Sequence, residues 1–381
     1  MSYVLKVREE DKEIQLTPIF VSNDGTDTFF LGSDSEKIKI PIPFILSKPF
    51  SYKLDEFLMW VVYQKEPSES AIFQVYEKTL EDKEGRIGWI FPLHSILSSD
   101  HDYANNEHFL VYANAAFRKL LYGEGQALEA KSLNYAAGRT YSLSDFYPDN
   151  AIILIVYKKD IAKLKDFDLT DYLPSIYSNG YSNNINVKKN ATAVEGVRGR
   201  KRINIESVCS EVKNNKFIDL LIYEISKDEK NIDALLKFHL LYQVVELFIE
   251  RIYLQKVLEL VKDSKLSTKG PHEIKEELTG ISNEKNRLNI LFSGLGPCRE
   301  LKEVCQKFQN NSVDTGTAEI LYKIRNELIH NYRKITPPQK EILNEINNTF
   351  EAVVLDMLIK FKYVDAKENV TANTKESQET E

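Results

Sequence analysis

The hydrophobic pattern of this chain changes its period near residue 205. Before that point apolar and polar residues alternate or apolar residues cluster in short runs, which is typical of β-strands. After it apolar residues recur every three or four positions, which is typical of amphipathic α-helices. Because one regular element cannot follow both periods, we expect an α+β protein with a β-rich N-terminal domain followed by an all-α helical bundle. The length of 381 residues is sufficient for two domains.

The N-terminal domain is predicted to span residues 1–165. Its pattern predicts strands at 3–7, 13–21, 37–42, 57–63, 71–76, 87–91 and 151–157, and one helix at 107–122. The proline in Lys37–Ile42 favours an edge strand or a strand end. The pattern does not specify the order of the strands, and it indicates no task for this domain.

Residues 166–204 show neither period for most of their length and are predicted to be a linker. Ser178–Asn184 has the composition of a turn or loop. The linker ends in a basic cluster that consists of Arg198, Arg200, Lys201 and Arg202. Such a cluster can follow an RNA backbone. Since no aromatic residues are interleaved with it, a solvated linker is the alternative interpretation.

The helical bundle is predicted to span residues 205–362. Helical patterns run over 205–226, 232–262, 272–278, 298–308, 315–332 and 338–361. From Val364 onward the chain is polar, acidic and free of aromatic residues, so residues 363–381 are predicted to be a disordered acidic tail.

Composition and charge limit the classes of function. The net charge of −7 argues against a protein that is coated in nucleic acid by its overall field, but it allows a local basic site. The three cysteines show no spacing typical of a disulfide framework or a zinc site. The first residues do not resemble a signal peptide, and no apolar run is long enough to span a bilayer. We therefore expect a cytoplasmic protein that contacts no membrane.

Neither a metal nor another cofactor is expected. The seven-residue spacing of His94, His101 and His108 is the one hint of a metal site. The residues around these histidines are loop-like and include no close pair of ligands, so a metal is the less favoured interpretation.

The predicted helix at 315–332 carries the residues most suited to chemistry. Its core stripe consists of apolar residues within a narrow arc: Leu321, Ile324, Leu328 and Tyr332. Arg325 lies about 40° from Leu321, at the edge of this stripe, whereas Asn326 and His330 lie about 140° and 180° away. Asn326 and His330 are therefore neighbours on the outer face, within reach of the long Arg325 side chain. We expect this face to be available to a second subunit.

Arg325, Asn326 and His330 resemble the motif of the HEPN ribonucleases, in which an Arg and a His are separated by four to six residues on the penultimate helix of a small bundle. An Asn directly after the Arg is also common in that family. The long preceding helix of such proteins often carries an acidic residue among apolar ones, and here Glu246 lies within Tyr242–Phe248. The resemblance covers about residues 205–362 and does not extend to the first half of the chain.

The resemblance implies a metal-independent endoribonuclease that cuts single-stranded RNA as a homodimer with a composite site. The ribose 2′-oxygen would attack the adjacent phosphate and leave a 2′,3′-cyclic phosphate and a 5′-hydroxyl. Arg325 would bind the scissile phosphate, and His330 would orient or exchange a proton. Asn326 would hold the ribose or order the histidine. Glu246 would support the site by pairing with Arg325 without touching the RNA. The alternative is that Glu246 is an ordinary acidic residue of a helix surface.

The same resemblance implies a toxin or an anti-phage effector of the abortive-infection kind. The N-terminal domain is then expected to sense a phage-derived trigger or to control the active dimer, with or without a regulatory partner. The alternative is a non-catalytic bundle that dimerises or binds RNA or a protein partner. Neither the RNA substrate nor the trigger can be identified from the residues.

Overall fold

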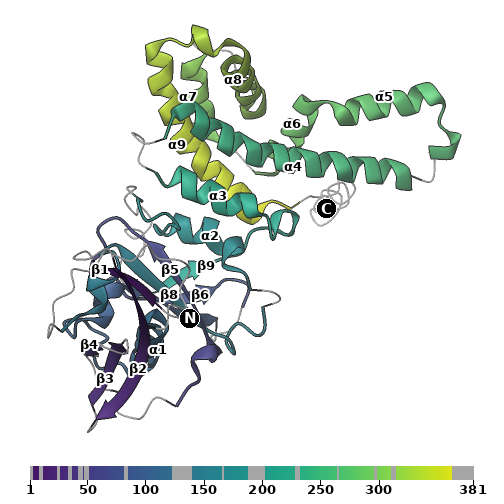
Figure 1. Cartoon of the computed structure of the whole chain (residues 1–381). Helices are drawn as coiled ribbons and strands as arrows, with labels where there is room; N and C mark the ends of the chain where they lie inside the picture. The colour runs from purple at the N-terminus through teal and green to yellow at the C-terminus, as the bar shows by residue number, and fades with distance from the viewer. Residues whose placement is uncertain are drawn as a thin grey trace, which may run out of the picture. The chain divides into compact units, whose positions relative to one another are not determined.

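The computed structural model describes residues 3–7, 12–23, 26–32, 37–41, 46, 51–80, 85–121, 140–164, 167–187, 202–227, 232–263, 266–295, 298–309 and 315–362. The chain divides into two compact units (Figure 1). The first unit comprises Met1–Glu206 and Ile218–Asp228, and the second comprises Ser207–Phe217 and Glu229–Glu381. Both β-sheets lie in the first unit, whereas the second is helical in its described part, so the α+β class is confirmed.

A four-stranded antiparallel sheet comes first in the chain. Its strands are β1 (Tyr3–Val7), β2 (Lys12–Asn23), β3 (Thr26–Gly32) and β4 (Lys37–Pro41), in the order β1-β2-β3-β4. The long strand β2 pairs with β1 through its first part and with β3 through its second part, as the pairs Leu16–Tyr3 and Thr17–Gly32 show. All neighbours in this sheet are therefore consecutive in the sequence.

The second sheet has five strands in the order β5-β8-β7-β6-β9. Their bounds are Phe57–Tyr63 for β5, Phe73–Glu77 for β6, Arg86–Pro92 for β7, Ala151–Tyr157 for β8 and Arg202–Ile205 for β9. Neighbouring strands are antiparallel, except that β6 and β9 are parallel. Strand β8 lies between β5 and β7, and it is apolar and buried from Ala151 to Val156. This continuous burial is expected of a strand covered on both faces.

Three helices belong mainly to the first unit. Helix α1 (Glu107–Leu121) packs on β5, β7 and β8, and helix α2 (Leu169–Ser178) contacts β9. Most of helix α3 (Lys216–Ile225) also lies in this unit, where the Tyr177 hydroxyl donates a hydrogen bond to the Ile225 carbonyl. The range predicted as a linker thus contains α2 and most of β9, and α3 groups with the sheets rather than with the bundle.

The second unit contains six α-helices in its described part. They are α4 (Ala234–Lys262), α5 (Pro271–Ser282), α6 (Glu284–Gly294), α7 (Arg299–Phe308), α8 (Thr317–Asn331) and α9 (Pro337–Lys360). The long helices α4 and α9 pack along each other, with the rings of Phe238 and Phe350 5.7 Å apart. Helix α6 packs on α4, α7 packs on α9, and α8 is held by α6 and α7. Helix α6 was absent from the sequence-based prediction.

A buried ion pair lies inside the α4–α9 contact. The Lys237 ammonium is 2.9 Å from Oε2 of Glu351, and the two side chains are 6% and 4% exposed. The distance between these two atoms is that of an ion pair. The angles at Oε2 do not meet the criteria for a hydrogen bond. Asn347 donates a hydrogen bond to the carbonyl of Ala234 beside it. The core of this unit therefore contains two charged groups among its apolar side chains.

No helix in the described part of the chain is both long enough and apolar enough to cross a membrane.

Candidate functional site

Helix α8 presents its faces as the helical wheel predicts, except that Tyr332 lies beyond the last residue of the helix, in a short 3-10 turn, and is only partly buried. Leu321, Ile324 and Leu328 are buried against the rest of the unit. Arg325 is half-buried at the edge of this stripe, and His330 is exposed on the opposite side. The outer face of α8 is thus open to solvent and is not covered by the described part of the chain.

The Arg325 guanidinium is held by groups from two helices. Nη1 donates to Oδ1 of the adjacent Asn326 at 3.1 Å, and Nη2 lies 3.4 Å from Oε1 of Glu246 on α4. The guanidinium also lies over the ring of Tyr242, 5.7 Å from its centroid. The side chains of Arg325 and Glu246 are 23% and 46% exposed, so this is a partly solvated ion pair. The structure therefore contains the pairing of Glu246 with Arg325 that the sequence analysis considered.

The Tyr242 phenol is kept protonated by its surroundings. Burial, followed by the nearby Glu284 carboxylate, raises the pKa of Tyr242 well above its usual range. Its hydroxyl donates a hydrogen bond to Oε1 of Glu284 at 3.3 Å. Tyr242 is thus a neutral aromatic platform under the guanidinium.

His239, which the sequence analysis missed, lies on the same side of α4. Positions 239, 242 and 246 are spaced i, i+3 and i+7 and therefore share one helix face. Burial lowers the pKa of the His239 imidazole, the positive charge of Arg325 lowers it further, and Glu246 opposes this effect. His239 is consequently a half-buried and neutral imidazole at pH 7. The spacing with Tyr242 and Glu246 was the signal that could have revealed it.

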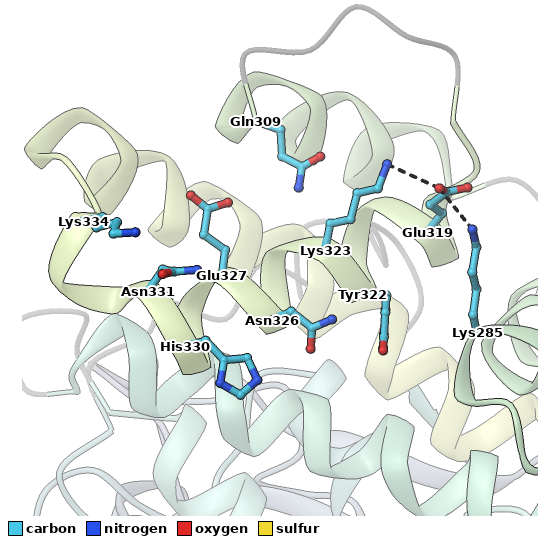
Figure 2. Close-up of a pocket in the computed structure, with 10 residues that line it drawn as sticks. All are labelled: Lys285, Gln309, Glu319, Tyr322, Lys323, Asn326, Glu327, His330, Asn331 and Lys334. Carbon is cyan, nitrogen blue, oxygen red and sulfur yellow. Dashed lines mark ion pairs between the residues drawn. The ribbon is translucent and has the colours of Figure 1, made fainter.

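A pocket of about 580 Å³ opens along the outer face of α8 (Figure 2). Its lining residues are mostly polar: Lys285, Gln309, Glu319, Tyr322, Lys323, Asn326, Glu327, His330, Asn331 and Lys334. Tyr322, Asn326 and His330, which are spaced i, i+4 and i+8, project from the same side of the helix. Asn326 both lines the pocket and accepts the hydrogen bond from Arg325. It therefore connects the guanidinium to the pocket that contains His330.

Two of the pocket lysines share one carboxylate. Glu319 lies 3.1 Å from the Lys285 ammonium and 3.3 Å from that of Lys323 (Figure 2). The hydrogen bonds from Lys285 and then Lys323 lower the pKa of Glu319 below its usual range. The carboxylate is thus charged at neutral pH and holds both lysines at one end of the pocket.

Arg325 and His330 are not in direct contact within one chain. Among the described residues no hydrogen bond or ion pair joins them, and Asn326 stands between them on the helix surface. A phosphate bound at Arg325 and Asn326 would have His330 on its pocket side. The motif residues are brought together as one surface rather than as a bonded pair.

The predicted basic cluster is not brought to this site by the described residues. Arg198, Arg200 and Lys201 lie outside the described part of the chain. Arg202 begins β9 in the first unit, with its guanidinium 5.2 Å from the centroid of the Tyr76 ring. Arg202 is therefore partly engaged by the sheet.

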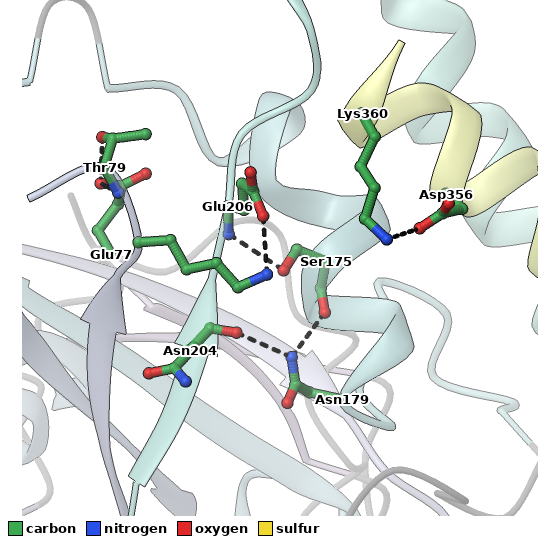
Figure 3. Close-up of polar contacts among 9 residues, drawn as sticks. Glu77, Thr79, Ser175, Asn179, Asn204, Glu206, Asp356 and Lys360 are labelled. Carbon is green, nitrogen blue, oxygen red and sulfur yellow. Dashed lines mark hydrogen bonds and ion pairs between the residues drawn. The ribbon is translucent and has the colours of Figure 1, made fainter. Parts of the chain in front are cut away.

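Strand β9 is fastened to α2 by polar contacts (Figure 3). The Asn179 side chain donates to the carbonyl of Asn204, and the Glu206 amide donates to Oγ of Ser175. The Glu206 carboxylate also pairs with Lys78 at 2.8 Å. The segment after the basic cluster is thus part of the fold of the first unit.

Two of the three spaced histidines, His101 and His108, have protein groups as partners of their ring nitrogens. His101 Nε2 is 2.8 Å from the Ser95 carbonyl oxygen. His108 Nδ1 accepts a hydrogen bond from the indole of Trp89 at 3.0 Å, and its Nε2 is 2.7 Å from Arg86. Within the described residues no group of three His, Cys, Asp or Glu side chains has the arrangement of a metal site.

Comparison with known proteins gives no relative from which a role could be transferred. No protein-family model, no curated protein and no solved structure matches this chain.

Proposed function

We propose that the second unit is a metal-independent endoribonuclease of the HEPN kind that cuts single-stranded RNA. The observation that carries this proposal is the polar surface of α8, on which Asn326 links the guanidinium of Arg325 to the pocket containing His330. A permanent cation beside a titratable imidazole matches the needs of phosphodiester cleavage, namely stabilisation of the phosphate charge and transfer of protons.

The pocket has the chemistry that a single-stranded RNA requires. Lys334 supplies positive charge for phosphates, Lys285 and Lys323 together exceed the charge of the one Glu319 carboxylate that they share, and the Tyr322 ring supplies a face for a base. The backbone of an RNA strand passing along α8 would place one phosphate near Asn326. The lining has three lysines and two glutamates, so its net charge is weakly positive although that of the whole chain is negative.

The chemistry assigned to each group follows from its position. Arg325 neutralises the charge that develops on the phosphate when the ribose 2′-oxygen attacks it, and loss of one such donor typically slows a reaction about 100–1000-fold. His330 exchanges a proton with the attacking or the leaving oxygen, a contribution of about 100–10,000-fold. Asn326 orients the guanidinium through the 3.1 Å hydrogen bond. The products are a 2′,3′-cyclic phosphate and a 5′-hydroxyl.

The open outer face of α8 supports a homodimer with a composite site. Ile329 is 43% exposed on this helix, directly before His330 in the sequence. An apolar side chain next to the site residues favours contact with a second copy, because it would remove that side chain from water. Two-fold symmetry at this face would bring two sets of Arg325 and His330 together. The first unit would then regulate the dimer in response to a trigger, as in a toxin or an abortive-infection effector.

The test is cleavage of single-stranded RNA by the purified protein in EDTA. We expect fragments ending in 2′,3′-cyclic phosphate, and at least 100-fold less cleavage by Arg325→Ala and by His330→Ala. Arg251→Ala and His272→Ala serve as matched controls, since both residues are exposed on other helices of the same unit. Cleavage that depends on a metal and survives both site substitutions would refute the proposal.

A non-catalytic RNA-binding or dimerisation module is the second candidate. The ion pair of Arg325 with Glu246 favours it, because a guanidinium whose charge is already balanced is less available to a phosphate. Glu246→Gln removes the competing charge. Since a partly exposed pair contributes about 0–1 kcal/mol, we expect up to about fivefold tighter RNA binding. Fluorescence anisotropy with labelled RNA measures it. Tighter binding without any cleavage, even with candidate triggers present, would select this candidate.

A further inference from the structure

We propose that His239 of α4 is the second proton-transferring group of the Arg325 site and acts on the opposite side of the phosphate from His330. This inference rests on the proposed ribonuclease function, and it assigns a residue outside the α8 motif.

The position of His239 is defined by its neighbours on α4. Tyr242 and Glu246, three and seven residues further along, both contact the Arg325 guanidinium, at 5.7 Å and 3.4 Å. With a rise of about 1.5 Å per residue, His239 lies about 4.5 Å along the helix from Tyr242 on the same face. The α4 face that carries His239 is therefore the face that contacts Arg325, and the Arg325 charge accordingly helps to lower the pKa of His239.

The two imidazoles lie on different helices, His239 on the α4 face that also carries Tyr242 and Glu246, and His330 on α8. Tyr242 and Glu246 of that α4 face contact the guanidinium, whereas His330 lines the pocket that Asn326 shares. Displacement at phosphorus needs an entering and a leaving oxygen roughly in line on opposite sides of the phosphate. A phosphate at Arg325 would therefore have one imidazole near each of these oxygens.

The charged groups facing His239 favour its neutral form. They are Arg325 from α8 and Glu246 from its own helix, and the adjacent Phe238 ring lies edge-on at 6.2 Å. Burial and the Arg325 cation hold the His239 pKa below the usual histidine value of 6.5, against the weaker influence of Glu246. A neutral imidazole can accept a proton, so His239 is suited to be the base.

The proposed step is balanced in protons and bonds. The 2′-hydroxyl gives its proton to His239 while its oxygen forms the new bond to phosphorus. The bond from phosphorus to the 5′-oxygen breaks, and that oxygen takes a proton from His330. The pair ends with a proton on His239 and none on His330, and exchange with water restores both.

The test compares His239→Ala, His330→Ala and the control His272→Ala, in which an 86% exposed imidazole of the same unit is removed. We expect His239→Ala to cleave RNA at least about 100-fold more slowly at pH 7. The decline of the wild-type rate at low pH, which lies below pH 6.5 if His239 is the base, should disappear in this variant. Added imidazole should restore part of the rate, which would not occur if His239 only supported the fold. Far-UV circular dichroism confirms folding.

Two outcomes separate this inference from the proposed function. If His239→Ala keeps the wild-type rate and pH profile while Arg325→Ala and His330→Ala are inactive, the His239 assignment is wrong and the ribonuclease stands. If the wild type cleaves no RNA even with candidate triggers present, both are refuted. NMR titration of the His239 ring gives a readout that does not need activity: its midpoint should rise in Arg325→Ala, and an unchanged midpoint would overturn the geometry.

Discussion

Replacing Lys237 with methionine should destabilise the second unit by about 3–5 kcal/mol, because it removes the ion-pair partner of the buried Glu351 carboxylate. The magnitude follows from burial: the two side chains are only 6% and 4% exposed, and the ammonium is 2.9 Å from the carboxylate oxygen. Lys237 also loses its hydrogen bond to Asn348, at 3.3 Å.

The assay is urea unfolding followed by two signals. Both tryptophans of the chain, Trp60 and Trp89, lie in the first unit, so their fluorescence reports that unit alone. Circular dichroism at 222 nm reports mainly the helices of the second unit. With an m value of about 2 kcal/mol/M, a loss of 3–5 kcal/mol moves the helical midpoint down by about 1.5–2.5 M. The fluorescence midpoint should stay in place.

Two variants make the experiment decisive. Lys360→Met removes the exposed Asp356 pair on the same helix α9, where the side chains are 63% and 47% exposed, and should cost no more than about 0.5 kcal/mol. The double substitution Lys237→Met with Glu351→Leu should recover most of the loss, since a buried pair can often be replaced by apolar side chains. A single Lys237→Met variant within about 1 kcal/mol of the wild type would show that the pair is hydrated and would refute the reasoning.

Three further outcomes are expected. Gly88→Ala should cost the first unit at least about 1–3 kcal/mol by fluorescence-detected unfolding, because a Cβ there would lie 2.1 Å from the Ile155 carbonyl oxygen. Burial and then Arg86 lower the pKa of His108 to about 4. The folded state therefore resists protonation, and the stability of the first unit should fall between pH 6.5 and 4, less steeply in His108→Gln. Asp233→Ala removes the cap that accepts two amide hydrogen bonds at the start of α4 and should cost about 1 kcal/mol by circular dichroism.

The elements with a strong local pattern were predicted closely. Strands β5 and β8 have the predicted bounds, because each is a compact run of apolar and β-branched or aromatic residues. Helices α4 and α9 were predicted to within two residues at each end, since their stripes repeat over many turns.

The pattern missed strand β3, which pairs with the adjacent β2, as well as helix α2, and two further missed elements depend on contacts with distant residues. Strand β9 has only four residues and exists as a parallel partner of β6. Helix α6 buries just Leu288, Leu291 and Phe292, a stripe too narrow to identify among its polar residues. Their local patterns were weak, and packing decided their structure.

What the sequence determined by itself is the periodicity of each half of the chain and the faces of α8. A residue's place on a helix follows from about 100° of rotation per residue, so Asn326 and His330 had to lie away from the stripe of Leu321. Tertiary structure alone decided which side chains surround Arg325. Glu246 and Tyr242, which contact its guanidinium, and His239, whose pKa its charge lowers, all come from another helix. The burial of Lys237 beside Glu351 was decided in the same way. Such contacts between side chains depend on how helices far apart in the chain pack, which local spacing does not encode.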